Sequence, residues 1–200
     1  MNRLLGACAL GLMLLYHCAQ AQVIEVESNG LKYQTLTRSG VTIMCAHLPA
    51  VLHQYAILQV AVSNGSPGPY TIRPEDFTFV RPDGTVVRAV AARAVVDMLF
   101  KKGSGSDVVK LVTTYEAGVY GNPQLKSTHG YEERRQGAIA ASGSKARAAA
   151  VASALALVQT KLAPGNSTDG AVFFPSEGKP LGSGRLVVRT NTDVFLFNAE

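Results

Sequence analysis

Cys45 and His47 are the residues whose types and spacing come closest to a chemical site in this sequence. One residue separates them, so on a β-strand both side chains point to the same face. A thiolate and an imidazole together bind copper or zinc, and His53 is the candidate for a third ligand. The same pair is also a candidate nucleophile and base. The alternative is that Cys45 is a small buried hydrophobe and that His47 ends a strand before Pro49.

A second candidate site is Ser142-Gly143-Ser144-Lys145, which matches the S-x-x-K pattern. In penicillin-binding proteins and β-lactamases the lysine of this pattern helps to activate a serine nucleophile at a helix start. The S-D-N and K-T-G sequences that accompany it there are absent from this chain. We therefore predict a helix cap and a solvated lysine rather than a serine hydrolase at Ser142, and we expect no enzyme activity.

Arg134, Arg135, Lys145 and Arg147 are the candidate contact face for a partner. They lie in residues 91–163, which carry ten basic and five acidic side chains. Residues 22–90 carry five of each, and residues 164–200 carry three basic and four acidic side chains, so this segment holds the whole positive excess. Its basic residues are spread out and not interleaved with aromatic ones, which argues against nucleic acid. The expected partner is a protein or a component of the cell envelope.

The elements around these residues are predicted to be strands on both sides of a helical segment. Residues 22–90 alternate apolar and polar side chains between turn signals, of which Ser28-Asn29-Gly30 indicates a hairpin. Further strands are expected at 170–174, 186–188 and 194–197.

Three helices are expected between the two sets of strands. They cover residues 91–101, residues 106–120 and the alanine-rich stretch 138–158, in which ten of 21 residues are alanine. Gly103-Ser104-Gly105-Ser106-Asp107 and Gly121-Asn122-Pro123 are interpreted as loops. Ser142 or Ser144 is the expected cap of the alanine-rich helix, and Pro164-Gly165 its expected end. Val151, Leu155, Val158 and Leu162 are expected to form one apolar stripe on it.

This order of elements predicts one mainly β domain over residues 22–200, an antiparallel β-sandwich of seven or eight short strands with a helical insertion at about 91–163. Two stretches resemble bacterial exported Ig-like domains: Val60-Ala61-Val62-Ser63-Asn64, and Pro74-Glu75-Asp76-Phe77 followed by Pro82-Asp83-Gly84. Gly170-Ala171-Val172-Phe173-Phe174 resembles the closing strand of such domains. The resemblance implies an Ig-like sandwich outside the cytoplasm and implies no catalytic residues.

Met1 to Ala21 has the order of a secretory signal peptide. Arg3 supplies the positive charge, Leu4 to Leu15 is an apolar run, and Ala19-Gln20-Ala21 offers a cleavage site. Leu15-Tyr16-His17-Cys18 and Leu5-Gly6-Ala7-Cys8 match a lipobox only in part, so lipidation is not expected. Cleavage leaves 179 residues with Cys45 as the single cysteine, and hence no intramolecular disulfide. Within the predicted helical insertion, the longest stretch without Asp, Glu, Lys or Arg, residues 148–160, is too short to span a membrane.

These observations predict a periplasmic or secreted, non-catalytic binding or structural module without a cofactor. Its recognition surface would be the basic helical insertion. The alternative is a periplasmic metal-binding or redox protein that uses Cys45 and His47.

Overall fold

The computed structural model describes residues 22–120 and 131–199, and the statements that follow concern these residues. The predicted signal peptide and the predicted loop 121–123 lie outside them. In the part described, no helix is long and apolar enough to cross a membrane.

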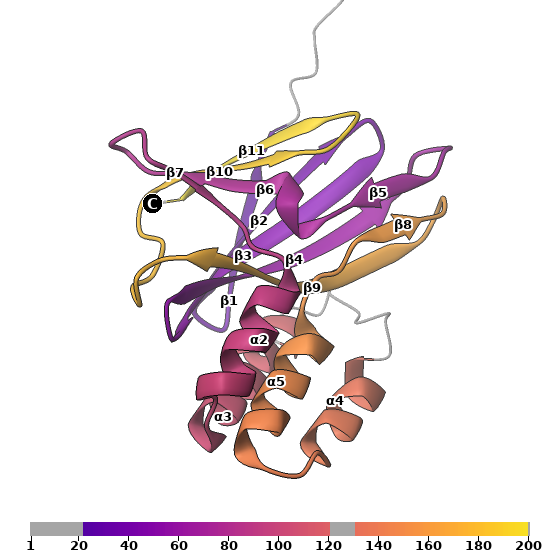
Figure 1. The fold of residues 1–200 in the computed structure, drawn as a ribbon. Helices are drawn as coiled ribbons and strands as arrows, with labels where there is room; N and C mark the ends of the chain where they lie inside the picture. The colour runs from indigo at the N-terminus through magenta and orange to yellow at the C-terminus, as the bar shows by residue number, and fades with distance from the viewer. Residues whose placement is uncertain (1–21, 121–130, 200) are drawn as a thin grey trace, which may run out of the picture.

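Two antiparallel sheets make up most of the fold (Figure 1). The larger sheet has the order β1-β2-β3-β4-β9, with β1 (Ile24–Ser28), β2 (Leu31–Arg38), β3 (Val41–Leu52), β4 (Tyr55–Asn64) and β9 (Ser167–Pro175). The smaller sheet has the order β11-β10-β6-β7, with β11 (Val194–Ala199), β10 (Gly184–Arg189), β6 (Phe77–Val80) and β7 (Val86–Arg88). A short ladder joins β5 (Tyr70–Ile72) to β8 (Thr160–Leu162). The prediction of a mainly β chain with antiparallel strands is confirmed.

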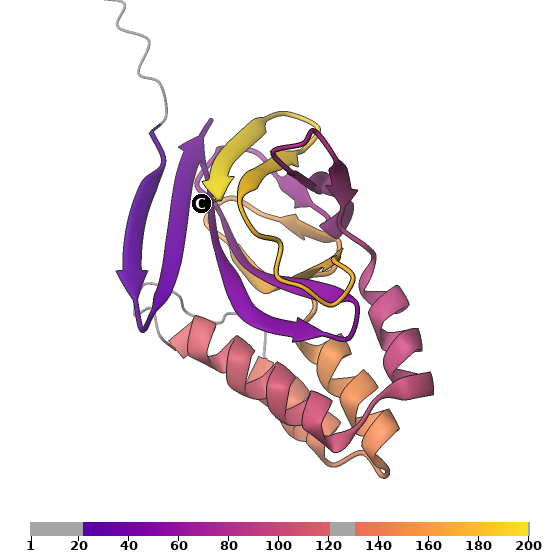
Figure 2. The ribbon, with the colours of Figure 1, turned by 90° about the vertical axis from the view of Figure 1, so that its left-hand side faces the viewer.

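Four α-helices gather on one side of the larger sheet (Figures 1 and 2). They are α2 (Ala92–Lys102), α3 (Gly105–Tyr120), α4 (Tyr131–Ile139) and α5 (Ser144–Leu155). A single 3₁₀ turn, η2 (Pro74–Asp76), precedes β6. The predicted helical insertion between two sets of strands is therefore present.

Strands β2, β3, β4 and β9 of the larger sheet bury side chains on both faces, whereas the edge strand β1 is exposed. Cys45 and Val60 face the smaller sheet and pack with Phe79 in one core cluster. Tyr33 and Phe173 face the opposite way and pack with helix residues such as Leu155 in a second cluster. The molecule thus has three layers, with the helices on the larger sheet and the larger sheet on the smaller one.

The Asn-Gly turn signal predicts the first hairpin correctly. Asn29 and Gly30 have φ angles of 50° and 72°, as the turn between β1 and β2 requires. The next hairpin turns through Ser39 and Gly40, which also have positive φ.

The alanine-rich stretch differs from its prediction at both ends. It holds the last two residues of α4 and the whole of α5. The N-cap of α5 is Gly143, with no side-chain hydrogen bond, so the caps predicted at Ser142 and Ser144 are wrong. The helix ends at Leu155, because Ala156 forms a bridge to Ala171 and the chain then runs into β8. The predicted helix end at Pro164-Gly165 and the predicted stripe are therefore wrong as well. Val158 is exposed, and Leu162 is a strand residue in the other core cluster.

Candidate functional site

Cys45 lies in the middle of β3, with its side chain between the two sheets. It is 2% exposed and belongs to the core cluster that the two sheets share. Burial raises the pKa of its thiol, so the thiolate that metal binding or nucleophilic attack requires is disfavoured. Its environment is that of a packed hydrophobe.

His47 lies on the same face of β3, as the spacing of the two residues predicts. Its ring meets the ring of Phe79 edge to face, with the centroids 5.9 Å apart. Burial lowers the pKa of the imidazole, so the ring is held in its neutral form. Its Nε2 atom is buried and has no hydrogen-bond partner among the described residues.

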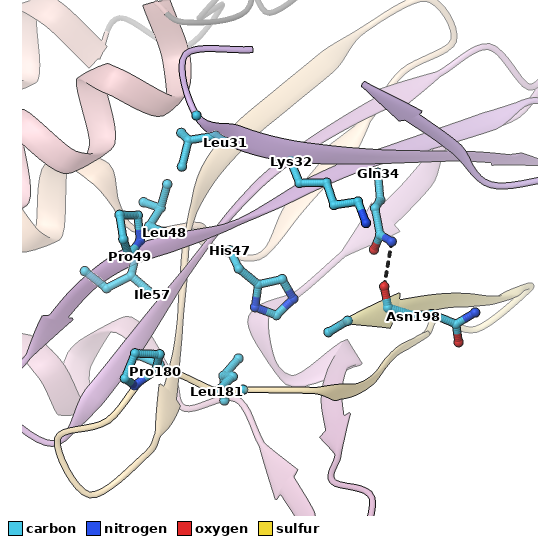
Figure 3. Close-up of a pocket in the computed structure, with 14 residues that line it drawn as sticks. Leu31, Lys32, Gln34, His47, Leu48, Pro49, Ile57, Pro180, Leu181 and Asn198 are labelled. Carbon is cyan, nitrogen blue, oxygen red and sulfur yellow. Dashed lines mark hydrogen bonds between the residues drawn. The ribbon is translucent and has the colours of Figure 1, made fainter. Parts of the chain in front are cut away.

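A cavity of about 340 Å³ opens beside His47, at one end of the sandwich (Figure 3). Apolar side chains from five segments form most of its wall: Leu31, Leu48, Pro49, Ala56, Ile57, Pro180, Leu181 and Ala199. Its polar side chains are Lys32, Gln34, His47 and Asn198. We call this space the His47 pocket. Its volume is at the lower end of the range of about 300–1,000 Å³ typical of ligand pockets.

Gln34 fixes the polar side of the His47 pocket. Its Nε2 donates to the backbone oxygen of Asn198 at 2.6 Å and so ties β2 to the last strand (Figure 3). The same nitrogen donates to Glu25, and Glu25 in turn forms an ion pair with Lys32 at 3.1 Å. The side-chain hydrogen bond from Gln34 and the interaction with Lys32 lower the pKa of Glu25. These contacts join β1, β2 and β11 on the polar side of the pocket.

The loop of residues 176–183, between β9 and β10, covers the pocket from the other side. Leu181 is 7% exposed and points toward His47, while Pro180 lies next to Ile57 (Figure 3). The loop is anchored at its start, where the Ser176 amide donates to Gln54 at 2.8 Å.

Sequence reasoning missed every residue of this pocket except His47. Gln34 and Asn198 are 164 positions apart, and no local pattern marks either of them. The one available signal was a polar glutamine at an inward position of β2, between the buried residues Tyr33 and Leu36.

His53 does not join Cys45 and His47. It lies in the turn between β3 and β4, where its Nε2 is 3.1 Å from the carboxylate of Asp107 at the start of α3. Among the described residues, no three His, Cys, Asp or Glu side chains lie close enough together to hold a metal ion. The predicted three-ligand set of Cys45, His47 and His53 is therefore not assembled.

The S-x-x-K motif forms no catalytic pair. Ser142 lies in the turn before α5, Lys145 lies in the first turn of that helix, and both are exposed. In the part of the chain that the structure describes, neither side chain makes a polar contact that would activate the serine.

Three of the four basic residues of the predicted contact face form hydrogen bonds or an ion pair within the helical layer. Arg134 donates to the backbone oxygen of Ala154 near the end of α5, at 3.3 Å. Arg135 forms an ion pair with Glu116 of α3, and Arg147 donates to the oxygen of Ala141 at 3.3 Å. Lys145 alone of the four is exposed without such a contact.

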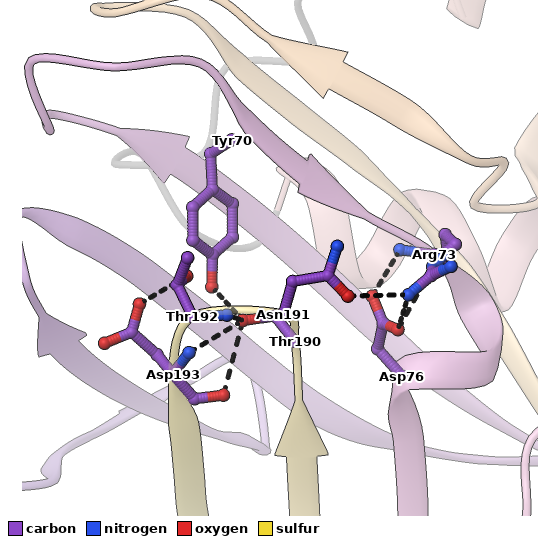
Figure 4. Close-up of polar contacts among 7 residues, drawn as sticks. All are labelled: Tyr70, Arg73, Asp76, Thr190, Asn191, Thr192 and Asp193. Carbon is purple, nitrogen blue, oxygen red and sulfur yellow. Dashed lines mark hydrogen bonds and ion pairs between the residues drawn. The ribbon is translucent and has the colours of Figure 1, made fainter.

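A separate polar cluster ties the loop before β6 to the turn between β10 and β11 (Figure 4). The hydroxyls of Tyr70 and Thr190 lie 2.7 Å apart, and Arg73 donates to the side-chain oxygen of Asn191 at 3.3 Å. Arg73 also forms an ion pair with Asp76 at 3.2 Å. Burial outweighs that pair and raises the pKa of Asp76. Each group has a partner inside the cluster, so its role is to join the segments.

Comparisons with known proteins place this geometry in no family. No family model matches the sequence, and no curated protein is similar enough to count as a relative. Among solved structures, the crystal structure of the yjhA protein from Bacillus subtilis, a structural genomics target, is similar to this chain at 10% sequence identity. The match covers 88% of this chain and 96% of that chain, with a TM-score of 0.37.

Proposed function

We propose that the protein is an exported, non-catalytic binding module whose ligand enters the His47 pocket. Export follows from the signal-peptide order of residues 1–21. A mostly apolar concave site with a few convergent polar groups is the usual form of a small-molecule site. The observation that carries the proposal is the buried Nε2 of His47, which has no partner among the described residues and belongs to a ring that lines the pocket.

The chemistry of the pocket selects a neutral ligand with an apolar body and a hydroxyl group. A neutral imidazole offers one donor and one acceptor, and a hydroxyl can meet either need. Because burial lowers the pKa of His47, the pocket does not supply a cationic imidazole for a charged ligand. The ligand's apolar body would replace water against Leu48, Ile57 and Leu181.

The proposed relationship to Ig-like domains is supported by the two packed sheets and by the turn motifs. The strand order does not support it. Strands β1 to β4 follow one another as a meander, whereas Ig domains use Greek-key connections. A scaffold of packed sheets that carries its binding residues at one open end remains part of the proposal.

The metal or redox alternative is less well supported. Cys45 is sealed in the core, and His53 is engaged by Asp107. Metal analysis of residues 22–200, with Cys45→Ser as the matched variant, tests this alternative. A stoichiometric metal that is lost in the variant would establish it over the pocket proposal.

The test of the pocket uses p-cresol as the hydroxylated probe and toluene as its matched analogue. In amide NMR titrations of residues 22–200, we expect saturable shifts at Gly30, Leu31, Leu181 and Gly182, with p-cresol at least tenfold tighter than toluene. His47→Phe should remove that preference, and Leu181→Trp should fill the pocket and abolish binding of both probes.

Leu196→Trp is the control, because Leu196 is exposed and outside the pocket lining. It should leave both titrations unchanged. Shifts that do not saturate in the unaltered protein, or binding that Leu181→Trp leaves intact, would rule out this pocket as the ligand site.

A further inference from the structure

A second, smaller cavity of about 200 Å³ lies between the helical layer and β9. Arg134 of α4 and Asp169 of β9 both line it, together with Ser153, Ala154, Ala156, Val158, Thr160 and Thr168. This cavity shares no lining residue with the His47 pocket. Three hydroxyl groups and two opposite charges make up its polar side.

Asp169 carries an unmet hydrogen-bonding capacity in this cavity. Its Oδ2 accepts a hydrogen bond of 2.6 Å from the hydroxyl of Tyr115 on α3, which fixes the orientation of the carboxylate. Its Oδ1 is buried and has no partner among the described residues. Leaving a buried charged oxygen without a donor is unfavourable, so a ligand that brings a donor to this carboxylate would stabilise it.

Arg134 supplies the opposite charge. Its Nε and Nη2 donate to the backbone oxygen of Ala154, which leaves further N–H donors on the guanidinium. Arg134 and Asp169 line the same cavity, yet no ion pair joins them in the described part of the chain. Two fixed opposite charges that do not neutralise each other across a small cavity complement a ligand with both charges.

From this arrangement we propose that the Arg134–Asp169 cavity binds a small zwitterion, of the class of free α-amino acids. The ligand ammonium would donate to the Asp169 carboxylate, and its carboxylate would accept from the guanidinium N–H groups of Arg134 that Ala154 does not use. The volume is below the range of drug-sized pockets, so the side chain of the ligand must be short.

Isothermal titration calorimetry of residues 22–200 with L-alanine tests the proposal. We expect saturable binding of L-alanine, with ethylamine and propionate each at least tenfold weaker because each lacks one of the two charges. Asp169→Asn keeps the acceptor for Tyr115 and Arg134→Gln keeps a donor, and each should weaken L-alanine at least tenfold.

Arg93→Gln is the matched control, since Arg93 is an exposed arginine of α2 outside the cavity. It should leave the affinity for L-alanine unchanged, as should His47→Phe. The proposal is overturned if L-alanine gives no saturable heat, or if propionate or ethylamine binds as tightly as L-alanine. The ligand comparison is made in the unaltered protein, so it decides the matter even where a variant fails to fold.

Discussion

Gly118 shows how a single residue couples the helical layer to the sheet. It is buried in α3, and the Tyr33 hydroxyl of β2 donates to its backbone oxygen at 2.6 Å. When the side-chain amide of Gln59 on β4 is oriented to match donors with acceptors, its nitrogen donates to the same oxygen at 3.2 Å and its oxygen accepts from the Val119 amide at 3.3 Å. A Cβ at position 118 would overlap the side chain of Gln59. Glycine is therefore required here for the close approach of the sheet side chains to the helix backbone.

Replacing Gly118 with alanine should lower stability, although alanine is the better helix former. We expect Gly118→Ala to destabilise the protein by about 1–3 kcal/mol, because Gln59 must move and lose its bonds. Gly137→Ala, in α4 where nothing lies near the added Cβ, should instead stabilise by about 0.5–1 kcal/mol. Urea unfolding of both variants measures the change in the free energy of unfolding. If the two substitutions changed it by the same amount and in the same direction, the role given to Gly118 would be contradicted.

At the scale of elements, the start of α3 is defined by a reciprocal pair of bonds. The Asp107 carboxylate accepts from the Ser104 amide at 2.8 Å, and the Ser104 hydroxyl accepts from the Asp107 amide at 3.3 Å. This is a capping box of the S-x-x-D kind. The interpretation of Gly103-Ser104-Gly105-Ser106-Asp107 as a loop holds for Gly103 and Ser104 and is wrong from Gly105, where α3 begins. His53 adds a third bond, which joins the β3–β4 turn to this helix start.

Asp107→Ala should cost about 1 kcal/mol at pH 7 through loss of the cap. Burial opposes ionisation of Asp107, but the hydrogen bonds from Ser104 and His53 outweigh it and lower the pKa of this carboxyl. An acid with a lowered folded-state pKa stabilises the protein above its unfolded value of 3.8, and this contribution is lost as the pH falls below 3.8.

Thermal unfolding is therefore measured across pH 2.5–7. We expect the difference in melting temperature between the unaltered protein and Asp107→Ala to become smaller in acid. Asp97→Ala removes an exposed carboxylate of α2 and should change stability by less than about 0.5 kcal/mol at every pH. If the difference in melting temperature between the unaltered protein and Asp107→Ala stayed constant below pH 3.8, the ionised form of Asp107 would not be what stabilises the helix start.

The elements were predictable where the signal is local. The Asn29-Gly30 turn and the helices near 92–102 and 105–120 follow from turn chemistry and periodicity. The end of α5 was not, because its cause is the bridge between Ala156 and Ala171, a contact with another strand. The His47 pocket could not be predicted from the sequence for the same reason, because it depends on a contact between Gln34 and Asn198, which are far apart in the chain.

At the scale of the whole molecule, the helical insertion is part of the core. It leaves and rejoins the sandwich at one strand, where the Val90 amide donates to Phe173 and the Leu157 amide donates to Ala171, each at 2.9 Å. Between these points its helices cover the face of the larger sheet that carries Tyr33 and Phe173. Without the helices, that apolar face would be open to water.

Charge introduced at the junction of these layers should therefore unfold the whole molecule. Ala152 is fully buried in α5, and Ala152→Glu would place an unpaired carboxylate against the larger sheet, at a cost of about 3 kcal/mol or more. Lys145→Glu, an exposed change at the start of the same helix, should alter stability by less than about 0.5 kcal/mol. If the layers form one cooperative unit, Ala152→Glu lowers the unfolding midpoint of helix and strand signals together. Loss of the helix signal alone, with the strands intact, would show instead that the sandwich is stable without its helical layer.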